Sequence, residues 1–355
     1  MGVREPATVA SRTSSGSRAG LVALYLGVAL LTPAAYEAYL RLSSPVQGKV
    51  AYSFDYSVLD ELLGKKPQPD VAVRATKRYG PEIAYDVVYS VGANGLRVGP
   101  PDTGAETTAC VLFFGCSYTY GEAVNDTETT AYRVGVLSRG RARTYNFGFH
   151  GYGPHQMLAI LERGNPRAST DCQPTHVIYQ AIPDHVRRAA GLPSFDRHGP
   201  RYRLDAAGRA VWAGHFDDDP TFVERWKGTF LLKQLKRSRT IQRLFDRERS
   251  LTDEDFALYA AIVRRSRELA TARFPGVRFS VLLWRDVGIA GGAELYEKVR
   301  AVLEAGQFDV REVEQILPGF ADDESPYRVP RDLHPNARAH DGVAQYVVRE
   351  ILGLP

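Results

Sequence analysis

The sequence is poor in the residues and patterns that several kinds of site require. Only three cysteines, Cys110, Cys116 and Cys172, occur in 355 residues, and their spacing fits no zinc site. There is no H-E-x-x-H motif, and His150 and His155 are five residues apart, the wrong spacing for two ligands on one helical face. The 45 basic residues nearly balance the 41 acidic ones, which gives no reason to expect nucleic acid as a partner. We therefore expect no metal, no cofactor and no nucleic acid.

Disorder and collagen-like repeats are also excluded, because 44% of the residues are hydrophobic and 24% are charged. No internal repeat is present. The length fits one large α/β domain or two small ones. One dense basic stretch, residues 233–249, has the pattern of the solvated face of an amphipathic helix.

One long uncharged run stands near the N-terminus. "AGLVALYLGVALLTPAAY" spans residues 19–36, follows a leader that contains Arg18, and ends before Glu37. Its length is at the lower limit for crossing a bilayer, and the basic leader favours a cytoplasmic N-terminus. We predict an uncleaved signal-anchor, a single pass through the cell membrane, with the rest of the chain outside the cytoplasm. The alternatives are a signal peptide cut near residues 33–35 and a buried core helix.

Past residue 106 the pattern alternates between strand and helix. Short apolar runs predict strands at residues 109–115, 142–149, 175–182, 277–284 and 308–315, and helical spacing predicts helices between them. This alternation predicts a parallel sheet covered by helices on both faces. The predicted parts are a basic cytoplasmic leader (1–18), a transmembrane segment (19–36), a juxtamembrane segment with a β-rich lead-in (37–106), and a catalytic domain (107–355) with an inserted hairpin and helix (188–252).

Three segments at predicted strand ends contain candidate catalytic residues. Ser117 follows the first strand in "FFGCSYTYGE"; taken alone it could be a nucleophile or a turn residue. Three glycines crowd the next strand–helix junction in "NFGFHGYGPHQ", residues 146–156, where a backbone N–H could stabilise an oxyanion. In "RDLHPNARAH", Asp332 lies two residues before His334 and could orient it as a general base.

In their order, these three segments resemble those of the SGNH (GDSL-type) hydrolases, over residues 107–187 and 275–355. The stretch "NGLR" (94–97) is similar to the lead-in of membrane-anchored bacterial members. The resemblance implies a three-layer α/β/α sandwich with a flavodoxin-like five-stranded parallel sheet. It also implies Ser117 as nucleophile, His334 as base and Asp332 as the acid that orients it. The backbone N–H groups of Ser117 and Gly151 are then oxyanion donors.

Two departures from the family pattern bear on activity. Cys116 stands where members usually have Asp, and "AIPD" (181–184) stands where they have G-x-N-D. The Asn of that motif supplies a third oxyanion donor, whereas Pro183 has neither an N–H nor a polar side chain. Loss of one oxyanion donor costs on the order of 3 kcal/mol in the barrier. His185 is our candidate for a substitute donor, and the alternative is a purely structural role for this histidine.

The resemblance makes acetylated polysaccharide of the cell envelope or the extracellular space the expected substrate. We expect an exported serine esterase that works through an acyl-enzyme. One alternative is a polysaccharide O-acetyltransferase, supplied by a membrane partner that delivers the acyl donor. Another is an inactive, anchored protein that binds glycan or assists assembly, and the missing Asn favours it.

A disulfide between Cys110 and Cys172 is also expected. In a flavodoxin-like sheet the first and third strands are neighbours, so both cysteines lie near the amino ends of adjacent strands. Adjacent strands are about 4.8 Å apart, which is within the reach of a disulfide. Cys116 would then remain a free thiol. The alternative is three unpaired cysteines.

Overall fold

The structure is a computed structural model that describes residues 15–43, 48–223, 250–285 and 292–355. The chain divides into two compact units, of which the larger holds residues 47–226 and 249–355. In the smaller unit, helix α1 (Ser15–Ser43) contains a segment, Gly20–Leu40, that is long and apolar enough to cross a membrane. The most apolar 18 residues of that segment are not buried against other described parts of the protein. The predicted helix at residues 19–36 is thus present.

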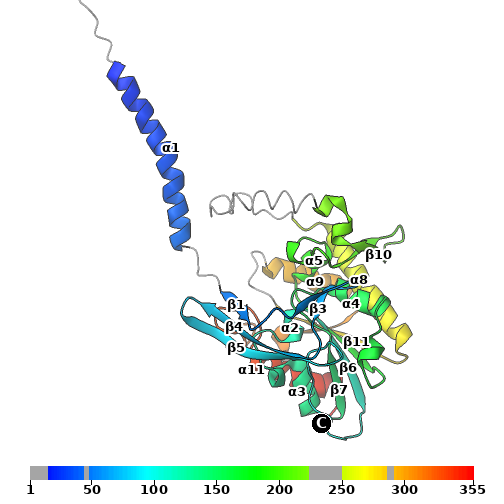
Figure 1. Ribbon diagram of the computed structural model, residues 1–355. Helices are drawn as coiled ribbons and strands as arrows, with labels where there is room; N and C mark the ends of the chain where they lie inside the picture. Colours follow the sequence, from blue (N-terminus) through cyan, green and yellow to red (C-terminus); the bar gives the residue numbers. More distant parts are fainter. Residues whose placement is uncertain (1–14, 44–47, 224–249, 286–291) are drawn as a thin grey trace, which may run out of the picture. The chain divides into compact units, whose positions relative to one another are not determined.

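A five-stranded parallel sheet forms the centre of the larger unit (Figure 1). Its first strand along the chain lies between the second and the third, and the fourth and fifth follow outward from the third. This is the flavodoxin-like strand order, so the predicted fold class is confirmed. The strands are β6 (Ala109–Gly115), β7 (Ala142–Asn146), β8 (His176–Ala181), β11 (Arg278–Leu283) and β12 (Asp309–Glu312).

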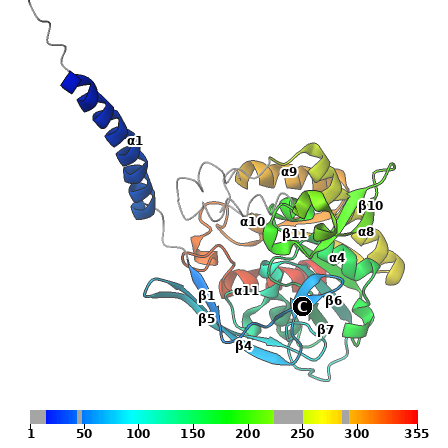
Figure 2. The ribbon, with the colours of Figure 1, turned by 45° about the horizontal axis from the view of Figure 1, so that its top comes forward.

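Alternate side chains of β6 enter two different hydrophobic cores. Val111 and Phe113 belong to a core shared with α3 and α11. Leu112 and Phe114 belong to a second core shared with α4, α8 and α9, which Figure 2 shows on one side of the sheet. Because both faces are covered, the strand is apolar throughout rather than alternating. The helices are α3 (Thr130–Leu137), α4 (Pro154–Glu162), α8 (Asp253–Arg273), α9 (Gly292–Ala305) and α11 (Ala337–Tyr346).

An antiparallel extension precedes the parallel sheet, and most of it was not predicted. Only residues 82–98 have a clear β pattern in the sequence, and they contain β5. The mixed stretch 41–70 contains three further strands, two of which form the hairpin β2–β3. The extension consists of β1 (Lys49–Tyr52), β2 (Ser57–Asp60), β3 (Gly64–Pro67), β4 (Val71–Tyr79) and β5 (Glu82–Val91), of which β1, β4 and β5 form one sheet.

The predicted insertion contains an antiparallel hairpin, β9 (Pro200–Leu204) with β10 (Ala210–His215). Side chains of this hairpin share a small core with α4 and α8. The predicted basic helix at residues 233–249 lies outside the described residues.

The predicted disulfide is present. Cys110 at the start of β6 is bonded to Cys172, with their Cα atoms 6.0 Å apart, and Cys116 is a buried free thiol.

Candidate active site

Ser117 lies in the turn directly after strand β6. The chain leaves the strand through Gly115, where a Cβ would lie 2.2 Å from Thr119 Oγ1 and 2.7 Å from the carbonyl oxygen of Gln180. Ser117 then begins the short helix α2 (Ser117–Tyr120), which ends at Gly121 with a left-handed φ of 84°. Glycine is required at both positions, and the turn holds Ser117 at the carboxyl edge of the sheet.

The structure brings Ser117, His334 and Asp332 into one hydrogen-bonded chain. His334 Nε2 is 2.8 Å from Ser117 Oγ, and His334 Nδ1 is 2.5 Å from Asp332 Oδ1. The same carboxylate oxygen accepts the backbone N–H of His334 at 2.9 Å. With Nδ1 bonded to the carboxylate, Nε2 of a neutral imidazole is free to accept the serine proton. The predicted convergence of these three residues is confirmed.

A lysine from the antiparallel extension holds the other oxygen of the buried carboxylate. Lys77 Nζ, on β4, is 2.5 Å from Asp332 Oδ2, and the Asp332 side chain is only 1% exposed. Burial opposes ionisation of Asp332, but the hydrogen bonds from His334 and Lys77 outweigh it and hold the pKa of Asp332 well below its usual range. Sequence reasoning did not find Lys77, because 255 residues separate it from Asp332.

A second chain of polar groups approaches His334 from the other side. Glu122 Oε2 is 3.5 Å from His334 Nε2 and 2.7 Å from His150 Nδ1. His150 Nε2 is in turn 2.5 Å from the Tyr56 hydroxyl. Burial opposes ionisation of Glu122, but the two imidazoles outweigh it and lower the pKa of Glu122 to about 2. The carboxylate is therefore charged, and it lies beside the His334 nitrogen that bonds to Ser117 Oγ.

The carboxylates of Glu122 and Asp332 also change the basicity of His334. Burial alone lowers the pKa of His334, whereas Glu122 and Asp332 raise it, and the net result is a pKa above the ordinary 6.5. A raised pKa makes His334 a stronger base, at the cost of holding it protonated to a higher pH.

The glycine-rich loop after β7 is fastened to the Ser117 turn. Asn146 Nδ2 donates to the carbonyl oxygen of Thr119 at 2.8 Å, and Asn146 Oδ1 accepts the N–H of Gly148 at 3.0 Å. A Cβ on Gly148 would lie 2.7 Å from Thr119 Cβ, so only glycine permits this approach. Neither the Ser117 N–H nor the Gly151 N–H donates a hydrogen bond to a described residue. Both are available as oxyanion donors.

His185 is not placed as the substitute donor expected from the sequence. Its ring is wholly buried and parallel to that of Tyr179, whose hydroxyl is 2.7 Å from His185 Nδ1. Burial also holds the pKa of His185 well below its usual range, so the ring is neutral. His185 begins α5 (His185–Ala189), and this helix turns the side chain into the core.

Arg97, in the "NGLR" stretch, bonds to the backbone that follows Ser117. Its buried guanidinium donates to the carbonyl oxygens of Tyr120, Gly121 and Val124 at 2.6–2.8 Å and forms an ion pair with Asp126 at 3.0 Å. The bonds to Tyr120 and Gly121 satisfy carbonyl groups at the end of α2, which has no further turn to bond them. Arg97 therefore supports the position of Ser117 without contacting it.

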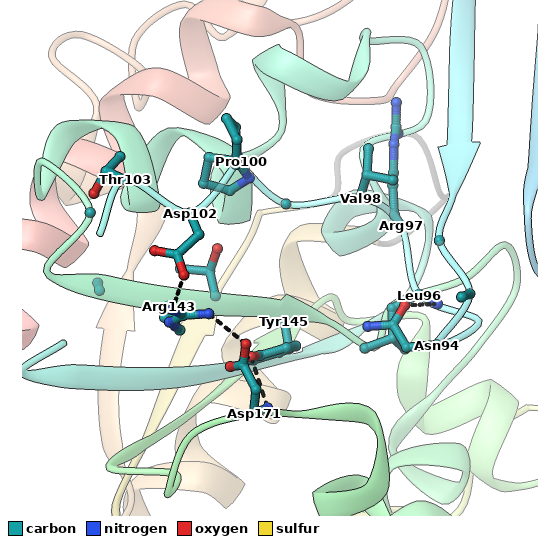
Figure 3. Close-up of a pocket in the computed structure, with 17 residues that line it drawn as sticks. Asn94, Leu96, Arg97, Val98, Pro100, Asp102, Thr103, Arg143, Tyr145 and Asp171 are labelled. Carbon is teal, nitrogen blue, oxygen red and sulfur yellow. Dashed lines mark hydrogen bonds and ion pairs between the residues drawn. The ribbon is translucent and has the colours of Figure 1, made fainter. Parts of the chain in front are cut away.

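A cavity of about 480 Å³ lies away from the triad, around the amino end of β7 (Figure 3). Arg143 projects there between Asp102 and Asp171 and bonds to both carboxylates. Its charge is neutralised within the protein, and ligands of open α/β sheets bind at the opposite, carboxyl end. This cavity is not part of the catalytic site. Within the described ranges, no group of three or more His, Cys, Asp or Glu side chains could hold a metal ion.

Comparison with known proteins gives distant structural likenesses only. No family model matches the chain, and no curated protein matches it. Among solved structures, a lipolytic protein of the G-D-S-L family from Veillonella parvula is 14% identical, with a TM-score of 0.38, over 69% of this chain and 99% of that one. An acetyl xylan esterase from Geobacillus stearothermophilus is 15% identical, with a TM-score of 0.38, over 69% of this chain and 95% of that one. Another acetyl xylan esterase, from Butyrivibrio proteoclasticus, is 11% identical, with a TM-score of 0.38, over 71% of this chain and 66% of that one.

Proposed function

We propose that this protein is an exported serine esterase that hydrolyses ester bonds through an acyl-enzyme. The observation that carries the proposal is the continuous hydrogen-bonded chain from Ser117 through His334 to Asp332. The free N–H groups of Ser117 and Gly151 support it, because an oxyanion needs donors that are not already engaged.

In the proposed reaction, Ser117 Oγ attacks the ester carbonyl carbon while His334 Nε2 takes the hydroxyl proton. The carbonyl electrons move to oxygen, which the N–H groups of Ser117 and Gly151 stabilise. The tetrahedral intermediate collapses, the alcohol leaves with the proton from His334, and Ser117 remains acylated. Water then attacks the acyl carbon and loses its proton to His334. As the bond between the acyl carbon and Ser117 Oγ breaks, His334 returns that proton to Ser117 Oγ and the acid leaves. Asp332 and Glu122 stabilise the imidazolium that forms twice in this cycle.

Exposed apolar side chains around the triad support a sugar-borne ester as the substrate. Phe195 is 56% exposed and lies against Gly151, and Leu333, 47% exposed, precedes His334. Tyr52 is 37% exposed, with its ring centre 6.2 Å from that of His150. Exposed apolar surface at the mouth of a polar site is typical of ligand binding, and the carbon face of a sugar ring fits such a surface. We propose O-acetyl groups on an envelope or extracellular polysaccharide as the target.

We also propose that α1 anchors the protein in the membrane and that the catalytic unit lies outside the cytoplasm. The length and hydropathy of Gly20–Leu40 support the anchor. The disulfide between Cys110 and Cys172 supports export, because such bonds persist in oxidising compartments.

Hydrolysis of p-nitrophenyl acetate tests the proposal. The full chain should release nitrophenol, Ser117→Ala should abolish turnover, and Ser325→Ala, at an exposed serine outside the site, should not affect it. Absence of turnover in the unmodified protein would favour the inactive glycan-binding alternative. With an acetylated polysaccharide, release of free acetate supports an esterase, whereas acetate that appears only on an added sugar acceptor supports an O-acetyltransferase.

A further inference from the structure

The oxyanion site described so far has two donors, and the residue that supplies a third in the resembled family is replaced by Pro183. Because His185 is buried in the core, the third donor has to come from elsewhere. In the part of the chain that the structure describes, two cationic side chains contact the Gly151 loop. Arg188 donates to the carbonyl oxygen of Tyr152 at 2.7 Å and is paired with Asp184 at 2.7 Å. The other is Lys65, on strand β3.

Lys65 is held beside the loop by its own main chain. Its carbonyl oxygen accepts the Tyr152 hydroxyl at 2.6 Å, one residue beyond Gly151. At the preceding residue, Gly64, a Cβ would lie 2.5 Å from the carbonyl group of His198. The β2–β3 hairpin is thus pressed against the inserted segment on one side and bonded to the oxyanion loop on the other. These contacts leave the Lys65 main chain little freedom.

The ammonium group of Lys65 lies directly over Gly151. A Cβ built on Gly151 would lie 3.2 Å from Lys65 Nζ and 2.8 Å from the ring of Phe195. Lys65 Nζ is also 5.4 Å from the centre of the Phe195 ring. Gly151 has a φ of +77°, so glycine is favoured there by the backbone as well as by the space that Lys65 and Phe195 occupy.

This ammonium has no hydrogen bond or ion pair with the described residues, although it is half-buried. Burial lowers the pKa of Lys65, the carboxylates of Asp196 and Glu122 raise it, and the charge of Arg188 lowers it, so that the net result is a pKa below the ordinary value for lysine. Asp196 is itself engaged, at 2.7 Å from His155 and 2.9 Å from Gln156. Phe195 is the only cation–π contact of Lys65 among the described residues, and a half-buried ammonium whose N–H groups bond to no acceptor is costly. A negative charge beside it would reduce that cost.

We propose that Lys65 Nζ is the third oxyanion donor, in place of the missing Asn. This inference rests on the proposed esterase function. As Ser117 Oγ bonds to the carbonyl carbon and its proton moves to His334, the carbonyl oxygen gains a full negative charge. The N–H groups of Ser117 and Gly151 and one N–H of Lys65 bind that oxygen. Because the ammonium is charged, its bond to the oxyanion is stronger than that of a neutral amide.

The test compares Lys65→Met with Lys66→Met on p-nitrophenyl acetate, an uncharged ester. Lys66 is the adjacent residue on the same strand and pairs with Asp60 at 2.8 Å, away from the triad. We expect Lys65→Met to lower kcat by about 100-fold or more with little change in KM, because an oxyanion exists only in the transition state. We expect Lys66→Met to match the unmodified protein.

An unchanged kcat in Lys65→Met would overturn the inference. A rise in KM alone would also overturn it, because that result indicates that Lys65 binds the substrate in the ground state. If Lys65→Met fails to fold, Lys65→Gln decides: a kcat loss of tenfold or more at unchanged KM is expected, and unchanged kcat overturns the inference. Failure of the esterase proposal is distinguishable, because the unmodified protein would then be inactive and Ser117→Ala would have no effect.

Discussion

Replacing Glu122 with Gln should shift the pH dependence of catalysis downward. Glutamine keeps the size of the side chain and an oxygen that can accept from His150 Nδ1, but it removes the negative charge 3.5 Å from His334 Nε2. That charge favours the imidazolium form of His334. Since the base must be neutral to accept the Ser117 proton, kcat/KM rises as pH passes upward through the pKa of His334, which lies above 6.5.

The size of the shift follows from the distance. Two unit charges 3.5 Å apart interact by about 1.2 kcal/mol at the dielectric constant of water and about 4.7 kcal/mol at an effective value of 20. Both side chains are largely shielded, with 13% of Glu122 and 19% of His334 exposed. One pKa unit corresponds to about 1.4 kcal/mol, so the acid limb should move down by about one pH unit or more. At alkaline pH, kcat should fall, because the imidazolium in the transition state loses a stabilising anion.

The assay is kcat/KM for p-nitrophenyl acetate across pH 4–9, with Glu128→Gln as the matched control. Glu128 is six residues further along and accepts the Asn125 N–H at 2.7 Å in a capping box, a role that glutamine can also fill. Its acid limb should coincide with that of the unmodified protein. An acid limb that is unchanged in Glu122→Gln, or that moves to higher pH, would refute the assigned role of Glu122.

Three further predictions concern stability. Lys77→Met leaves the buried Asp332 carboxylate with one partner fewer and should lower the free energy of unfolding by about 3 kcal/mol in urea titration, whereas Arg74→Met, which breaks an exposed pair with Asp86, should change it little. The disulfide joins positions 62 apart, and its removal in the double variant Cys110→Ala, Cys172→Ala should lower the free energy of unfolding by about 2–4 kcal/mol. Thiol titration of the denatured, unreduced protein should find one free thiol, and three free thiols would contradict the bond. A chain that begins at residue 41 should remain soluble and give the circular dichroism of an α/β protein, and aggregation would contradict the interpretation that the larger unit folds without α1.

The parallel sheet and the triad could be predicted because their signals are local. A strand buried on both faces, such as Ala109–Gly115, is a short apolar run between turn residues, and the prediction matches its bounds. Ser117, Asp332 and His334 each follow or precede such an element. Parallel topology then brings the ends of distant strands to one edge without further information.

The residues that surround the triad could not be predicted, because their positions depend on tertiary contacts. Lys65 lies in a strand of four residues and Lys77 in a partly exposed strand of nine, and their relation to Gly151 and Asp332 appears only in the fold. Glu122 follows the serine turn, but nothing in the sequence indicates that its carboxylate lies between two histidines. His185 failed as a predicted donor for the same reason, since proximity to Pro183 in sequence does not determine which way a helix turns its side chain.

The most direct test of the central claim is the site of covalent labelling by a serine-directed fluorophosphonate, located by mass spectrometry of proteolytic fragments. The account predicts a single adduct on Ser117, no adduct in Ser117→Ala, and much slower labelling in His334→Ala, because the hydroxyl then lacks its base 2.8 Å away. An adduct on another residue, or ester hydrolysis that survives Ser117→Ala, would contradict the account.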